Sequence, residues 1–195
     1  SRKKVSIWAP ELDAYSMFTQ LVRKPKEFVC LGHYVNGSFK KPSRPKPLML
    51  QIKDKGALAA FGMDSTHEMI DRFKAQYLPH PLRFHEVWNE TRGKKPIYAW
   101  EPVPPKGFVA LGMVCTTSED APKTESMRCV PKSWVNETKT KPKLIWNDAG
   151  TGGAKGSFWV INEMQMLSVV QGHIAPKNTF YDFPKKVFMA SEFAA

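Results

Sequence analysis

Hydrophobic residues in this chain recur mostly in short alternating runs, which is the period of half-buried β-strands. The clearest run begins at residues 100–105, Trp-Glu-Pro-Val-Pro-Pro, and continues at 106–112, Lys-Gly-Phe-Val-Ala-Leu-Gly. The prolines fix φ and remove backbone donors, so this piece is extended and cannot lie inside a helix or a central strand. Lys106 and Gly107 supply a turn. The pattern predicts a strand end, a corner, a turn and a new strand.

Parts of this pattern occur at two other places in the chain. Residues 7–10, Ile-Trp-Ala-Pro, are followed after an insertion by residues 27–32, Glu-Phe-Val-Cys-Leu-Gly. A weaker third copy combines residues 157–160 with residues 167–172. Because the spacing is irregular, this is divergent threefold repetition with insertions and not a solenoid. The residues expected at repeated structural positions are Trp8, Gly32, Trp100, Gly107, Gly112, Trp159 and Gly172.

One helix is expected, at residues 65–77. Residues 65–68, Ser-Thr-His-Glu, form a capping box, and Met69, Ile70, Phe73 and Tyr77 follow along one face. Further strands are expected at residues 5–8, 28–35, 48–52, 84–88, 127–131, 158–161, 166–174 and 187–190.

These elements predict an all-β, β-prism-like fold in a single domain, 1–195. Three pseudo-repeated antiparallel sheet units, at about 5–52, 97–135 and 144–190, would surround one axis, with the helical insertion outside them. Trp8, Trp100 and Trp159 would fill the core from equivalent positions. A β-sandwich is the alternative architecture.

Net charge is the strongest compositional signal. The chain has 29 Lys and Arg against 18 Asp and Glu, giving +11, which favours polyanionic partners such as anionic lipid. The alternative is a solvated basic surface that only aids solubility. The charges come in clusters, one of them in the proline-rich segment 40–47. The residues expected to bind membrane or a protein partner are Lys40, Lys41, Arg44, Lys46, Lys139, Lys141 and Lys143.

No pattern typical of catalysis is visible. A Ser/His/Asp signature and a nucleophile elbow are both missing, and the carboxylates are scattered. The glycine-rich segment 149–157 has the order Lys-Gly-Ser, not the Gly-Lys-Ser/Thr of a phosphate loop, so a hairpin loop is expected. His67 and Glu68 lack the second histidine of a zinc-protease helix. These observations predict a non-enzymatic protein without cofactor or metal. Nucleic acid is not favoured, because most aromatic residues occupy strand-core positions.

The three cysteines, Cys30, Cys115 and Cys129, do not form a disulfide framework and fit a reduced, cytosolic protein. A bond between Cys115 and Cys129 remains open, as does use of the formal glycosylation acceptors Asn36, Asn89 and Asn136. No secretory signal or long apolar run occurs, and the chain lacks an initiator Met, so we expect a domain of a larger protein.

The proline and glycine segment at 100–112 resembles the hallmark of the vacuolar-protein-sorting family numbered sixty-two, Trp-x-Pro-x-Pro-Pro-x-Gly-Tyr-x-x-Leu-Gly. Residues 127–131, 144–148 and 150–159 resemble the segments that follow it in that family. Phe108 replaces the tyrosine, and the insertion after Pro10 and the helix at 65–77 are further departures.

The resemblance implies a role in trafficking or lipid transport, since similar modules occur inside bridge-like lipid-transfer proteins. With the charge, it favours a cytoplasmic targeting or adaptor module, peripheral to membrane, that binds anionic lipid or a trafficking protein. The alternative is a glycan-binding or pore-forming-toxin-associated β-prism domain.

Overall fold

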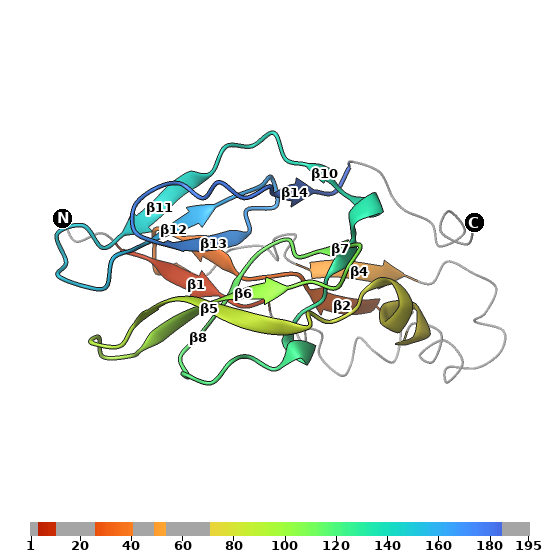
Figure 1. The fold of residues 1–195 in the computed structure, drawn as a ribbon, viewed down its shortest axis with the longest axis horizontal. Helices are drawn as coiled ribbons and strands as arrows, with labels where there is room; N and C mark the ends of the chain where they lie inside the picture. The colour runs from red at the N-terminus through yellow and green to blue at the C-terminus, as the bar shows by residue number, and fades with distance from the viewer. Residues whose placement is uncertain (1–3, 11–25, 41–48, 54–70, 185–195) are drawn as a thin grey trace.

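The computed structural model of the protein describes residues 4–10, 26–40, 49–53 and 71–184 (Figure 1). Strands dominate, so the all-β prediction is confirmed. The strands are β1 Ser6–Trp8, β2 Lys26–Cys30, β3 Tyr34–Asn36, β4 Met49–Lys53, β5 Arg83–Glu90, β6 Ile97–Val103, β7 Phe108–Val109, β8 Val114–Thr116, β9 Val130–Pro131, β10 Asn136–Glu137, β11 Lys143–Asn147, β12 Gly156–Val160, β13 Leu167–Gln171 and β14 Tyr181–Asp182. Among the described residues, two 3₁₀ turns accompany these strands, η2 Thr124–Ser126 and η3 Lys132–Trp134.

Every strand pair is antiparallel. Two sheets have three strands, in the orders β5-β6-β8 and β11-β12-β13, and β1 pairs with β3. Figure 1 shows the β11–β13 sheet above, the β5–β6–β8 sheet below, and β1 between them. Because β13 contacts β5 and β12 contacts β3, these three sheets enclose a common interior. The architecture is therefore the prism-like one and not a two-layer sandwich.

The three sheets share one register. In each sheet, a tryptophan pairs with the first or second residue of its partner strand. That partner residue lies two positions after the residue that we call axial, because it lies where the three sheets meet. The pairs are Trp8 with Tyr34, Trp100 with Val114 and Trp159 with Ser168. The axial residues are accordingly Gly32, Gly112 and Met166.

A ring of three backbone hydrogen bonds closes the sheets around the axis. His33 N–H donates to the Met113 carbonyl (2.9 Å), Met113 N–H to the Leu167 carbonyl (2.9 Å), and Leu167 N–H to the His33 carbonyl (3.0 Å). Each bond joins one sheet to the next. The ring satisfies backbone groups in the interior that water cannot reach.

The expectation that Gly172 is the third equivalent glycine is wrong. Met166 takes that place, because the residue before Leu167 in the ring corresponds to Gly32 and Gly112. Gly172 instead ends β13, has φ +92° and has open space where a Cβ would lie. The turn between Trp159 and Met166 is also shorter than the Trp100–Gly112 segment, so the third unit lacks a proline corner.

Each tryptophan of this set is fixed by a hydrogen bond from its indole Nε1. Trp8 donates to Ser6 Oγ (2.9 Å), Trp100 to Thr116 Oγ1 (2.8 Å) and Trp159 to Ser157 Oγ (2.9 Å). Trp100 and Trp159 are buried and Trp8 is half-buried. A buried aromatic ring contributes a large apolar area, and the indole bond fixes its orientation.

Several boundaries differ from the sequence prediction. The strand expected at 28–35 is broken at Gly32, whose φ of +141° turns the chain into the axis between β2 and β3. The strand expected at 127–131 shortens to β9, because η2 and η3 flank it. Residues 71–77 are helical, and Phe73 and Tyr77 stack on Trp134 at 6.1 Å. The capping box at 65–68 and the strand expected at 187–190 lie outside the described residues.

Candidate functional site

The predicted basic residues fall in two groups. Lys40 is exposed in the loop after β3, as the last described residue of that segment. Lys139, Lys141 and Lys143 are exposed along the segment that leads into β11. Lys41, Arg44 and Lys46 lie outside the described residues.

The loop at residues 36–40 is held in one conformation by its own polar groups. Ser38 N–H donates to Asn36 Oδ1 (2.6 Å), and Asn36 Nδ2 donates to the Lys40 carbonyl (3.3 Å). Ser6 Oγ, which accepts the Trp8 indole N–H, donates to the Ser38 carbonyl. Asparagine side chains commonly stabilise turns in this way. The bonds connect the loop through β1 to the core.

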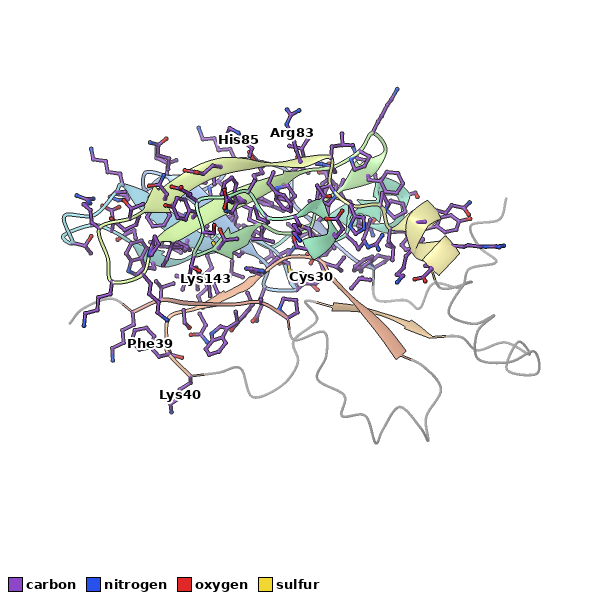
Figure 2. All side chains as sticks on the ribbon, turned by 90° about the horizontal axis from the view of Figure 1, so that it is seen from below. Cys30, Phe39, Lys40, Arg83, His85 and Lys143 are labelled. Carbon is purple, nitrogen blue, oxygen red and sulfur yellow. The ribbon has the colours of Figure 1, made fainter. Side chains whose placement is uncertain are left out.

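This loop lies beside β11. A Cβ placed on Gly37 would be 4.0 Å from Ile145 Cγ2 and 3.9 Å from the Lys4 carbonyl. Ile145 is two residues from Lys143, so the structure brings the loop that ends at Lys40 next to the strand that begins at Lys143. Figure 2 shows Phe39 and Lys40 below the body of the domain and Arg83 and His85 on the opposite side.

An aromatic residue stands within this basic surface. The Phe39 side chain is 66% exposed, and Lys4 Nζ lies 5.6 Å from the centre of its ring. Leu144, beside Lys143 on β11, is 41% exposed. We refer to Lys4, Phe39, Lys40, Lys143 and Leu144 as the Phe39 surface.

The segments that form the Phe39 surface are basic and carry no acidic residue. Residues 4–8, 36–40 and 139–147 contain no Asp or Glu. The ion pairs among the described residues lie elsewhere, as with Lys74–Asp71 and Arg92–Glu90. Uncompensated positive charge on one face attracts anions over distances of about 10 Å at 0.1 M salt.

The glycine-rich segment is a hairpin loop between β11 and β12, as predicted. Asp148 accepts from Gly156 N–H (2.8 Å) and lies 2.6 Å from His173 Nε2, and these contacts lower the pKa of its carboxyl. Glu90, on β5, accepts from the N–H groups of Ala154 (2.7 Å) and Arg92 (2.8 Å), which lowers its pKa to about 2. Both carboxylates therefore hold the loop in place.

Near the axis, Cys30 and Cys129 are buried and His33 and Cys115 are half-buried, and the shifts of their pKa values keep these groups neutral near pH 7. Burial lowers the pKa of His33 to about 4. Its Nδ1 accepts the Cys115 N–H (3.1 Å), so the ring proton resides on Nε2. Burial raises the pKa of the Cys115 and Cys129 thiols to about 12, and all three cysteines are free. These groups support the scaffold.

A shallow cleft of about 200 Å³ lies between β6, β7 and residues 178–181. Asn178 Nδ2 donates to Glu101 Oε1 across it (3.3 Å). Among the described residues, no group of three His, Cys, Asp or Glu side chains is placed to hold a metal ion.

Comparison with known proteins assigns a family to this chain. The family model described as Vacuolar protein sorting-associated protein 62 matches residues 5–181. The chain belongs to this family. Membership of the Vps62 family links this chain to vacuolar protein sorting. Comparison with curated proteins gives no significant match.

The fold of this Vps62-family chain is also similar to a solved structure. The crystal structure of GNIP1Aa from Chromobacterium piscinae matches with a TM-score of 0.62 and 16% sequence identity. The match covers 97% of this chain and 34% of the other, so this chain spans about a third of that structure's length. At this identity the likeness shows the fold alone.

The sequence pattern did not point to Phe39, and Lys4, although part of the basic cluster at residues 2–4, was not selected as a binding residue. The available signal was an aromatic residue between the Asn36-Gly37 turn and the basic segment. Its proximity to Lys4 and β11 depends on contacts between residues far apart in the chain. Among the described helices, none has the length and apolar character needed to cross a membrane.

Proposed function

We propose that this chain is a non-catalytic targeting module of a larger trafficking or lipid-transfer protein, and that it binds anionic membrane through its basic loops. The observation that supports this most is that Lys4, Lys40 and Lys143 lie on three segments without acidic residues, which the fold brings together. The family's link to vacuolar protein sorting supports a role in trafficking.

The proposed strength of binding follows from the charges. Each basic residue near an anionic membrane contributes about 1 kcal/mol. Three lysines of the Phe39 surface would therefore raise affinity by roughly two orders of magnitude over a neutral membrane, using about 1.4 kcal/mol per tenfold. Lys139 and Lys141, on the segment before β11, would add to the attraction.

Cosedimentation with vesicles tests this function. The bound fraction is expected to rise as phosphatidylserine replaces phosphatidylcholine. It should fall between about 0.1 M and about 1 M salt, because the screening length shrinks from roughly 10 to 3 Å. Absence of binding to phosphatidylserine vesicles at the low salt concentration, or binding that salt does not change, would contradict the proposal.

A further inference from the structure

We propose that Phe39 is a membrane anchor whose ring inserts between the lipids of an anionic bilayer while Lys4, Lys40 and Lys143 contact the headgroups. This rests on the proposed function and adds to it a defined docking site. The lysines alone would hold the domain at the surface. Phe39 would fix which side of the domain faces the membrane.

The Phe39 ring is exposed at the surface of the domain. Phe39 is 66% exposed although the domain has a well-filled interior, in which Phe84 and Phe158 are buried. Exposed aromatic residues carry much apolar area and tend to mark interaction sites when basic or polar groups surround them. Leu144, on the neighbouring strand β11, is a second exposed apolar side chain, at 41%.

The loop that carries Phe39 is pre-organised by hydrogen bonds. Asn36 bonds to Ser38 N–H and the Lys40 carbonyl, and Ser6 bonds to the Ser38 carbonyl. Phe39 lies between these fixed points. A loop already in its bound conformation loses little conformational entropy on binding.

A charge lies directly against the aromatic ring. Lys4 Nζ lies over the Phe39 ring, 5.6 Å from its centre. Lysine side chains can keep the ammonium group in the headgroup layer while their methylene chains lie against apolar surface. Lys4 can therefore contact a phosphate while the ring lies at the level of the upper acyl chains.

The same features favour a bilayer over a protein or a nucleic acid. The three segments that form the Phe39 surface carry positive charge and no negative charge, which matches the uniform negative potential of an anionic leaflet. In the described part of the chain, Phe39 is the one aromatic residue among the exposed large hydrophobic side chains. Nucleic acid strands are held by successive stacking rings.

A pair of matched substitutions tests the anchor. Phe39 and Leu82 are almost equally exposed, at 66% and 65%. Leu82 precedes Arg83, which Figure 2 shows on the side opposite Phe39. With vesicles of equal parts phosphatidylcholine and phosphatidylserine, Phe39→Ala is expected to weaken binding roughly tenfold, which corresponds to about 1.4 kcal/mol. Leu82→Ala should bind as the wild type does, and Phe39→Leu should restore most of the affinity.

Two charge-reversing substitutions, one on each side of the domain, complete the test. Lys40→Glu should weaken binding to the same vesicles by more than tenfold, whereas Arg83→Glu, on the opposite side, should change it less than threefold. Thermal unfolding of every variant checks that the domain is folded.

The outcomes separate the two proposals. If the wild type binds in a salt-sensitive way and Phe39→Ala binds equally well, the anchor is wrong and the proposed function stands. The anchor is also wrong if Leu82→Ala weakens binding as much as Phe39→Ala. If the wild type does not bind phosphatidylserine vesicles, both proposals fail.

Discussion

Replacing Gly32 by alanine is expected to lower the free energy of unfolding by about 3–5 kcal/mol, through backbone strain and overpacking together. Gly32 has φ +141°, a conformation that L side chains rarely adopt. A Cβ there would lie 3.1 Å from the Cα of Gly112, and backbone at the closed axis has little room to move. Chemical denaturation of the variant and the wild type measures the loss.

Gly172→Ala is the matched control for Gly32→Ala. Gly172 also has a positive φ, +92°, but no atom lies within 4 Å of the added Cβ. Only the conformational cost remains, about 1–2 kcal/mol. Equal losses at the two positions would contradict an axis formed by Gly32, Gly112 and Met166.

Replacing Asn162 by alanine is expected to cost about 3 kcal/mol, because two buried backbone groups and one partly buried one lose their partners. Asn162 is 1% exposed. Its Nδ2 donates to the carbonyls of Leu111 (3.2 Å) and Tyr181 (3.0 Å), and its Oδ1 accepts from Met166 N–H (3.0 Å). One side chain thus fixes the short turn before Met166 and ties it to the second unit. Denaturant unfolding gives the magnitude.

Asn178→Ala provides the comparison for Asn162→Ala. The Asn178 side chain is exposed and makes a 3.3 Å bond to Glu101. Its removal should cost less than about 0.5 kcal/mol, the usual range for surface positions. If Asn162→Ala is equally mild, water reaches the turn and the interior is not closed as described.

The fold class could be predicted because alternation, prolines and turn residues are local signals. The proline corner at 102–105 and the Gly107 turn, φ +86°, lie where the local pattern places them. The third axial residue could not be predicted in this way. At the axis the chains are so close that a Cβ on Gly112 would be 2.9 Å from Met166 Cβ. The Met166 side chain occupies the space, so glycine is required at Gly112 and not in the third unit.

For a similar reason, only part of the candidate site could be predicted from the sequence. Clustered lysines are a compositional signal, and Lys40 and Lys143 are exposed. Their proximity, and the ring of Phe39 beside Lys4, depend on the packing of Gly37 near Ile145, which lies 108 positions further along the chain (145 − 37). A local pattern carries no information about such a contact.

Closure of three units around one axis is the feature on which both the scaffold and its surface loops depend. Hydrogen exchange of the amides of His33, Met113 and Leu167, the three donors of the axial ring, tests it most directly. The three amides should exchange together and only through global unfolding, so that each reports the full free energy of unfolding. If one of them exchanges far faster than the other two, the ring is open at that unit and the units do not form a closed prism.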